Sequence, residues 1–231
     1  MLNVICLKHG KKYSAEYVNN LYRMVQRHLT VPHRFICFTE RPKHIDPKIE
    51  IMPLPNLELQ GWWYKPYFFK ADLFPYGDVN LFLDLDTVII KNIDKLITYE
   101  EGHFVGLQDP SRIWRPEPKK LGSAIMRWRA GTYGDIWTTL ESNQNIAKRF
   151  AGDQNYIWDL HKDNLKYFPH HWIMSYKWEV RSRSDLIGVR EQSRFKTVVN
   201  PRVHNDTAVF AFHGFPMVHD VKDPIIVDNW C

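Results

Sequence analysis

The sequence feature that most constrains the fold is an apolar run that ends in two carboxylates. The run Leu81-Phe82-Leu83 is continuously apolar, as a central strand covered on both faces requires. It continues directly into Asp84-Leu85-Asp86, and carboxylates at the end of a buried strand are costly unless a cation meets them. In open α/β sheets, ligands collect at the carboxyl ends of the strands. The sequence therefore predicts a buried strand over 79–85 with a binding site at its end.

Regular elements are predicted on both sides of this strand. Residues 14–28 place apolar side chains at helical spacing, with Ser14 as the N-cap, between expected strands at 2–7 and 34–39. This strand–helix–strand order predicts parallel pairing, and Pro- and charge-rich residues 108–120 predict a surface loop. Further strands are expected at 49–52, 104–107, 122–128 and 208–212, and helices at 62–74, 93–99, 133–140 and 153–160, with nothing assigned to 162–199.

Composition narrows the class of protein. The chain has 231 residues, of which 44% are hydrophobic and 25% charged, which excludes a disordered chain and fits one domain. The net charge of +5 suits an anionic partner, but the basic residues are dispersed and form no nucleic-acid-binding motif, so no nucleic-acid partner is expected. No apolar run of the length of a transmembrane segment is present, which leaves only peripheral contact with a membrane open.

The cysteines and the start of the chain predict where the protein works. Cys6 and Cys37 lie within apolar runs and are predicted to be buried free thiols, as in proteins of a reducing compartment. Lys8 and His9 interrupt the first apolar stretch, so no signal peptide is expected. Together these features predict a cytoplasmic protein.

The pair Asp84-x-Asp86 suits one clear chemical task. Mg²⁺ and Mn²⁺ prefer carboxylate and phosphate oxygens, so the pair is suited to hold a divalent ion whose other ligands are phosphates. The alternative is a turn that caps a following helix.

At this point the sequence resembles a known family. Leu81-Phe82-Leu83-Asp84-Leu85-Asp86-Thr87-Val88 is similar to the Asp-x-Asp segment of GT-A-fold glycosyltransferases, which use nucleoside diphosphate sugars. The similarity is greatest to family 8-like enzymes, such as glycogenin, bacterial lipopolysaccharide hexosyltransferases and small virus and phage relatives. Further segments match in the same order: Cys6-Leu7-Lys8-His9-Gly10 with Tyr13, Phe38-Thr39-Glu40, Gly122-Ser123-Ala124-Ile125-Met126, Gly152-Asp153-Gln154 and His213-Gly214.

The resemblance implies a fold, a reaction and a set of site residues. It implies a single Rossmann-like α/β domain over 1–231, with a mixed, mostly parallel sheet flanked by helices, a nucleotide-binding half (1–107) and an acceptor and sugar half (108–231). It implies metal-dependent transfer of a hexose, most simply from a UDP-sugar, to a hydroxyl on a glycan, a lipid-linked glycan or a protein. The implied ligands of Mn²⁺ or Mg²⁺ are Asp84, Asp86 and His213, the implied catalytic residues are Asp153 and Lys65, and the implied donor-binding residues are Lys8, Tyr13, Thr39, Glu40, Lys65, Asp84, Leu85, Ser123, Gln154 and Gly214.

Alternatives accompany several of these roles. Tyr13 either stacks on the base or only packs before the helix, and Lys70 competes with Lys65 for the place beside the carboxylates. Asp153 either contacts the sugar or caps the helix that follows it. Two other late histidines compete with His213, namely His204 and His219, and Asp109 is a second candidate base besides Asp153. The candidate acceptor platforms are Trp62, Trp63 and Trp172. Four arginines either attract anionic acceptors or are only surface charge: Arg112, Arg115, Arg127 and Arg129.

Two other functions compete with glycosyl transfer. A haloacid dehalogenase-type phosphatase also has an apolar strand followed by Asp-x-Asp, which Asp84-Leu85-Asp86 nearly fits, but that motif normally opens its fold. A non-catalytic module that binds nucleotide sugars or glycans would keep the aromatic stacking and need no metal ligands. Release of inorganic phosphate identifies the first, and metal-independent ligand binding identifies the second.

Overall fold

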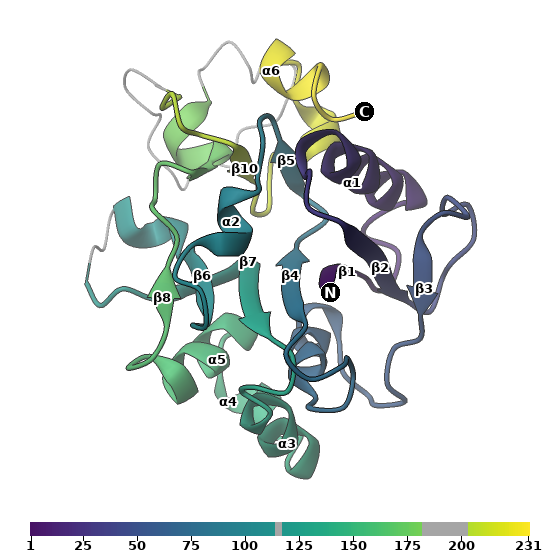
Figure 1. Ribbon diagram of the computed structural model, residues 1–231, viewed down its shortest axis with the longest axis vertical. Coiled ribbons are helices and arrows are strands. Elements are labelled where there is room, and N and C mark those ends of the chain that lie inside the picture. The colour runs from purple at the N-terminus through teal and green to yellow at the C-terminus, as the bar shows by residue number, and fades with distance from the viewer. Residues whose placement is uncertain (114–116, 182–202) are drawn as a thin grey trace.

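The apolar strand that ends in the two aspartates lies at the centre of the main sheet. The computed structural model describes residues 1–113, 117–181 and 203–231. In it, β4 (Val79–Leu83) is the middle strand of a seven-stranded sheet of order β3-β2-β1-β4-β7-β6-β8 (Figure 1). The other strands are β1 (Leu2–Lys8), β2 (His33–Thr39), β3 (Glu50–Met52), β6 (Val105–Gln108), β7 (Leu121–Arg129) and β8 (Lys166–Tyr167).

The order of the strands reverses beside β4. From β1 the chain moves outward through the parallel neighbours β2 and β3, and then returns to place β4 on the other side of β1, again parallel. β7 pairs antiparallel with both β4 and β6, so it runs opposite to the rest of the sheet. Ligands of open α/β sheets bind where the order reverses, outside the carboxyl ends of the strands. That place here is the shared end of β1 and β4.

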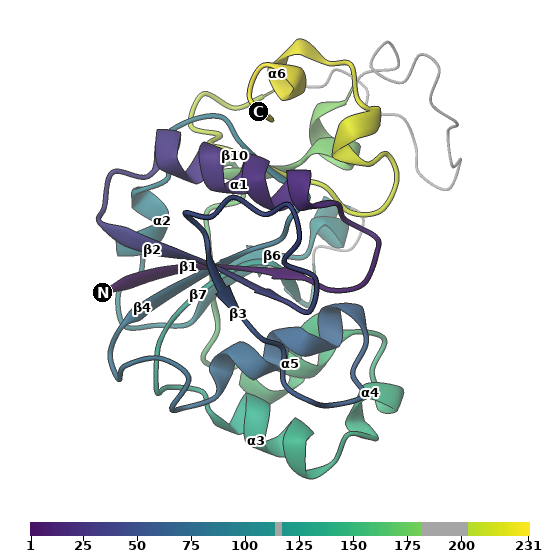
Figure 2. The same cartoon turned by 90° about the vertical axis from the view of Figure 1, so that its right-hand side faces the viewer.

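Each central strand sends alternate side chains into two separate cores. Val4, Leu81 and Leu83 belong to one apolar cluster, while Ile5 and Phe82 belong to the other. This period of two is what a pleated strand buried on both faces produces. In Figure 2 the sheet lies between α1 (Ala15–His28), α2 (Lys95–Thr98) and α6 (Pro224–Val227) on one side, and α3 (Asp135–Ser142), α4 (Ile146–Arg149) and α5 (Asp153–His161) on the other.

A small second sheet brings the end of the chain back to the aspartates. Its order is β5-β10-β9, in which β10 (Val209–Ala211) pairs antiparallel with β5 (Thr87–Ile89) and parallel with β9 (Ile173–Ser175). The backbone N–H of Phe212 donates to the carbonyl of Asp86 over 3.0 Å. The remaining short helices are η1 (Gly61–Phe69), η2 (Pro110–Ile113), η3 (Tyr176–Val180) and η5 (Val218–Asp220).

Several element predictions need correction. The strand expected over 79–85 ends at Leu83, and Leu85 and Asp86 form a turn, because the chain leaves the main sheet there for the second one. The helix expected over 62–74 is a 3₁₀ helix, Gly61–Phe69, with Pro66 inside it, and proline lacks the N–H that an α-helix interior needs. Ser14 occupies the N-cap position of α1 but its side chain makes no capping hydrogen bond.

The structure also bears on the cysteines, on the unassigned segment 162–199 and on membrane-spanning helices. Cys6 and Cys37 are buried free thiols, as predicted. The unassigned segment 162–199 contributes β8, β9 and η3, while residues 182–199 lie outside the described part of the chain. Among the described residues, no helix has both the length and the apolar character needed to cross a membrane.

The burial of β4 makes a stability prediction. Leu81 is fully buried in the central strand, whereas Leu160 on α5 is 40% exposed. Leu81→Ala is expected to lower the free energy of unfolding by about 2–5 kcal/mol, because it removes buried methyl groups and leaves a cavity. The matched change Leu160→Ala is expected to cost less than about 1 kcal/mol. Urea unfolding followed by circular dichroism measures both, and equal losses would contradict the central position of β4.

Candidate active site

A cavity of about 750 Å³ opens at the carboxyl ends of β1 and β4 and the amino end of the antiparallel β7, where the strand order reverses. This volume lies in the usual range for small-ligand sites. Many of the residues that the sequence predicted for the site line it: Tyr13, Lys65, Asp84, Asp86, Ser123, Asp153, Gln154, His213 and Gly214. The fold therefore gathers into one cavity side chains that lie far apart in the sequence.

Two backbone hydrogen bonds hold this arrangement together. The N–H of Asp84 donates to the carbonyl of Ala124 over 2.8 Å, which places the start of β7 beside the end of β4. The bond from the Phe212 N–H to the Asp86 carbonyl places His213 on the far side of the same turn. Both aspartates are thus fixed between β7 and the end of β10.

Lys65 is the cation that meets the carboxylates. Its side chain is buried, and its Nζ donates to Asp84 Oδ2 over 2.8 Å and to the carbonyl and Oγ of Ser123 over 3.1 and 3.2 Å. Burial lowers the pKa of Lys65, but the nearby carboxylates of Asp84, Asp153 and Asp86 outweigh it and raise the pKa above its ordinary value. Lys65 therefore stays protonated. The competitor Lys70 lies elsewhere, paired with Asp72.

Asp86 is buried without a cation in direct contact among the described residues. Its Oδ2 accepts a hydrogen bond of 2.6 Å from the phenol of Tyr13. Burial, together with repulsion from Asp84, raises the pKa of Asp86 to about 6, although the hydrogen bond from Tyr13 acts to lower it. Burial and Asp86 also raise the pKa of Tyr13 well above its ordinary range, so the phenol remains a donor. No helix follows the pair, since β5 comes next, so the alternative of a helix-capping turn is wrong.

Asp153 is the third carboxylate of the cavity. It is the first residue of α5, whose N-cap is Gly152, so the alternative that Asp153 caps this helix is wrong. The side chain is buried, and its Oδ2 has no hydrogen-bond partner within the described residues. Burial raises the pKa of Asp153, while Lys65 and Ser123 oppose the shift. A buried polar atom without a partner at the wall of a cavity is suited to a ligand hydroxyl.

His213 faces the cavity from the end of β10. Its Nε2 shares a hydrogen bond of 2.6 Å with Ser175 Oγ, and the ring of Trp178 lies 4.2 Å away, centroid to centroid. Burial, followed by the charge of Lys177, lowers the pKa of His213 to about 4, so the imidazole is neutral at neutral pH. The competing histidines lie elsewhere: His219 binds the phenol of Tyr17, and His204 lies near His171.

Four of the predicted donor-binding residues do not line the cavity. Lys8 is buried and points its Nζ toward the Arg41 carbonyl at 3.4 Å, and Thr39 Oγ1 accepts from the Arg41 N–H. Glu40 accepts the N–H of Gly10 over 2.8 Å, which holds the loop that follows β1. The side chain of Leu85 lies in the apolar core.

The remaining candidates, which are the tryptophans of the acceptor platform, Asp109 and the arginines, also differ in whether they line the cavity. Trp62 lines the cavity and is 53% exposed, whereas Trp63 is buried against Tyr156 and Trp172 packs on Tyr99. Asp109 lies outside the cavity but accepts a hydrogen bond from Gln154, which does line it. The described arginines of this set do not line the cavity either: Arg112 pairs with Glu179, Arg127 binds the carbonyls of Tyr99 and Glu100, and Arg129 pairs with Glu101, while Arg115 lies outside the described residues.

Sequence reasoning missed three contributors to the site. Lys11 and Lys12 line the cavity beside Tyr13, and the Lys12 Nζ lies 4.6 Å from the Tyr13 ring centroid. Ser175, which holds His213, comes from a segment whose sequence shows no pattern. The position of the lysines next to Tyr13 was an available signal, whereas nothing in the sequence marks Ser175.

Three side chains of the cavity offer donor types that a divalent ion accepts, although their ligand atoms do not all lie within 4.8 Å of one another. Asp84 and Asp86 offer carboxylate oxygens, and His213 offers a neutral imidazole, a set that Mn²⁺ accepts and that Mg²⁺ accepts through its oxygens. Each of the three now has a protein partner: Lys65, Tyr13 and Ser175 respectively. A bound ion would compete with these partners.

Comparison with known proteins bears on the fold. No family model matches the chain, and no curated protein matches its sequence. The glycosyltransferase GlyE of Streptococcus pneumoniae TIGR4 is structurally similar, with a TM-score of 0.62 and 10% identity over 100% of this chain and 62% of that one. The galactosyltransferase LgtC, solved in complex with donor and acceptor sugar analogs, gives a TM-score of 0.59 and 12% identity over 94% of this chain and 88% of that one.

These matches confirm the predicted fold. The chain has the mixed α/β architecture of the GT-A glycosyltransferases, with its mostly parallel central sheet flanked by helices. It spans less than two thirds of the length of GlyE.

The buried carboxyl of Asp86 predicts a pH dependence of stability. Its pKa is about 6 in the folded chain and 3.8 ordinarily. Between these two pH values the Asp86 carboxyl is ionised in the unfolded chain but still protonated in the folded chain. This group therefore lowers the stability of the wild type as pH rises from about 4 to above 6. Asp86→Asn removes this cost and keeps an acceptor for Tyr13. In urea unfolding with chelator, the stability of the variant relative to wild type is expected to rise over this interval, by up to about 3 kcal/mol; a pH-independent difference would contradict the assignment.

Proposed function

We propose that the protein is a glycosyltransferase that moves a hexose from a nucleoside diphosphate sugar, in the first place a UDP-sugar, to a hydroxyl of a glycan-type acceptor. The observation that carries this proposal is the cavity at the reversal of a GT-A sheet, in which Asp84, Asp86, Lys65 and Asp153 meet. GlyE and LgtC are glycosyltransferases of the same fold, and LgtC binds donor and acceptor sugar analogs. Because a fold hosts many functions, the proposal depends on the residues of the site.

The loop after β1 is proposed to bind the nucleotide. Glu40 holds Gly10 in this loop, and Tyr13 presents an aromatic ring that suits any flat base. Lys11 and Lys12 add positive charge near the same wall, which favours a diphosphate. Stacking would require Tyr13 to exchange its hydrogen bond with Asp86 for the base.

Asp84, Asp86 and His213 are proposed to hold Mn²⁺ or Mg²⁺, which when bound supplies positive charge that stabilises the diphosphate leaving group. Lys65 contributes charge of its own, since its pKa is raised and its ammonium group remains protonated. The carboxylate of Asp84 fixes this buried ammonium group, and burial strengthens its electrostatic interactions.

The wall formed by α5 and β7 is proposed to bind the sugar. Asp153 Oδ2 lacks a partner among the described residues and is suited to accept from a sugar hydroxyl or to stabilise positive charge near the anomeric carbon. Ser123 and Gln154 line the same wall. Trp62, exposed at the cavity, offers a flat apolar face on which an acceptor sugar can stack.

Neither competing function has a specific observation in its favour. The Asp-x-Asp segment follows β1, α1, β2 and β3 and has the antiparallel β7 as a neighbour, whereas the phosphatase motif normally opens its fold. A non-catalytic module would not need a buried Asp153 whose Oδ2 lacks a hydrogen-bond partner among the described residues.

The direct test is turnover of a donor panel. The protein is incubated with Mn²⁺ and UDP-, GDP- and dTDP-sugars, and release of the nucleoside diphosphate is measured with and without chelator. We expect metal-dependent release from at least one donor. No release from any donor would overturn the enzyme proposal, and release of inorganic phosphate from a phosphomonoester would support the phosphatase instead.

Asp153 gives a sharper prediction on the same assay. Asp153→Asn keeps the size of the side chain but removes its charge, and we expect kcat to fall by about 10²–10³-fold, as for the loss of one transition-state contact. The control is Asp159→Asn on the same helix, whose side chain is 52% exposed and pairs with Lys162. An Asp153 variant as active as this control would exclude a catalytic role.

A further inference from the structure

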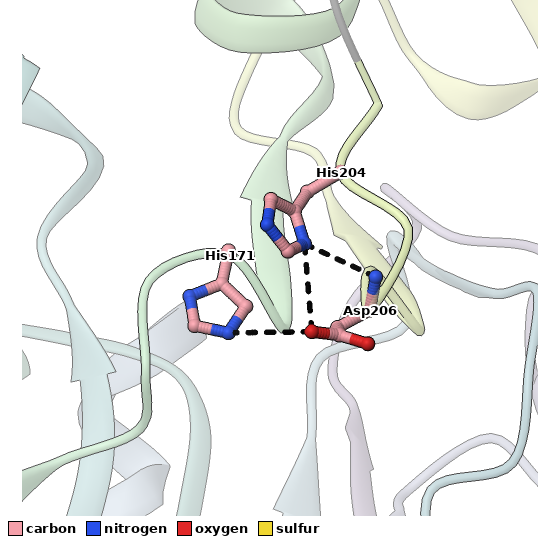
Figure 3. Close-up of side chains that lie close together, drawn as sticks. All are labelled: His171, His204 and Asp206. Atoms are coloured by element: carbon pink, nitrogen blue, oxygen red, sulfur yellow. Dashed lines mark hydrogen bonds and ion pairs between the residues drawn. The ribbon is translucent and has the colours of Figure 1, made fainter.

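A second group of metal-ligating side chains lies outside the cavity. His171 precedes β9, and His204 and Asp206 precede β10 (Figure 3). One ligand atom of each lies within 4.8 Å of the other two. β9 and β10 are parallel, with Ile173 opposite Val209 at their start. The group is therefore at the amino end of the small sheet, whereas His213 follows its carboxyl end.

The distances within the group are close to those of a bound ion. Asp206 Oδ2 lies 3.9 Å from His171 Nε2 and 3.7 Å from His204 Nδ1. In a tetrahedral site with metal–ligand bonds of about 2.0–2.1 Å, two ligand atoms are about 3.4 Å apart. The two distances from Asp206 exceed this spacing by about 0.3–0.5 Å, and the two imidazole ligand atoms lie within 4.8 Å of each other. In Figure 3 both rings point toward the carboxylate.

The surrounding contacts hold the three residues in place. Thr207 Oγ1 donates to the His171 carbonyl over 2.8 Å, and the rings of His171 and His204 lie 4.5 Å apart, centroid to centroid. The Asp206 N–H donates to His204 Nδ1 over 3.1 Å, a bond that an ion at Nδ1 would replace. Lys95 lies close but donates to the Asp206 carbonyl over 2.7 Å.

The neighbouring lysines do not occupy the group of His171, His204 and Asp206. Lys91 binds the Asn205 carbonyl, as Lys95 binds that of Asp206, so both ammonium groups are directed to backbone oxygens.

We propose that His171, His204 and Asp206 bind a transition-metal ion of the Zn²⁺ class, with water completing its coordination. Two imidazoles and one carboxylate suit Zn²⁺, Cu²⁺ or Ni²⁺, whereas the carboxylates of the cavity and a diphosphate suit Mn²⁺ or Mg²⁺. The ion links two segments that are far apart in the chain, and an ion that binds only the folded state stabilises it.

The experiment uses the full chain without a histidine tag, dialysed against chelator and titrated with ZnCl₂ by calorimetry and by thermal unfolding. It is done in the Asp86→Asn background, which weakens the cavity as a competing site. We expect about one equivalent of Zn²⁺ and a raised unfolding midpoint. His171→Ala in that background is expected to weaken binding by at least about 10-fold, since loss of even an outer partner of a metal ligand costs 10–100-fold.

Two further variants keep the test decisive. Asp206→Asn changes an exposed residue, so it is expected to fold normally and to lose the zinc-dependent rise in midpoint. The control His103→Ala removes another exposed histidine, which lies 3.9 Å from Glu100. This variant is expected to keep the zinc-dependent rise in the unfolding midpoint. The proposal is overturned if the His171 and Asp206 variants bind Zn²⁺ as well as the control does, or if the Asp86→Asn protein binds none.

Discussion

The ion pair between Lys65 and Asp84 is the interaction on which the site depends. A buried strand that ends in two carboxylates needs a compensating cation, because desolvated charge is costly. Lys65 supplies it from η1 and at the same time binds Ser123 at the start of β7. One buried ammonium group therefore joins three elements at the carboxyl edge of the sheet. The second aspartate, Asp86, has only the phenol of Tyr13 as its direct side-chain partner among the described residues, and its pKa is raised accordingly.

This partial compensation explains how the cavity can serve a ligand. Asp86 and Asp153 are carboxyls that the protein buries at a cost, and both line the cavity proposed to bind the donor. A divalent ion would remove the repulsion between Asp84 and Asp86, and a sugar hydroxyl would give Asp153 Oδ2 a partner. Functional sites are often where a fold keeps such unfavourable groups, because the ligand completes them. In the proposed metal site, the neutral His213 would be a ligand that adds no charge.

The sequence predicted the parts of the site that follow from strand pattern, and it failed where contacts across the fold decide. The apolar run before Asp84 marks a central strand, so both the sheet and the position of the aspartates were predictable. The family resemblance favoured Lys65 over Lys70, and Lys65 is the one that lies beside Asp84. Which of Trp62 and Trp63 is exposed depends on how η1 packs, and Pro66 makes that element a 3₁₀ helix rather than the expected α-helix. Ser175 lies in a segment without periodicity, so its contact with His213 had no signal in the sequence.

The central claim is that Asp84 and Asp86 form a metal-assisted site for a nucleoside diphosphate. Calorimetric titration of UDP into the protein, in Mn²⁺ and again in chelator, tests it most directly. We expect saturable UDP binding in Mn²⁺ that is lost in chelator, and lost in Mn²⁺ when Asp86 is replaced by Ala. Binding of equal strength under all three conditions would contradict it, as would no binding by the wild type in Mn²⁺.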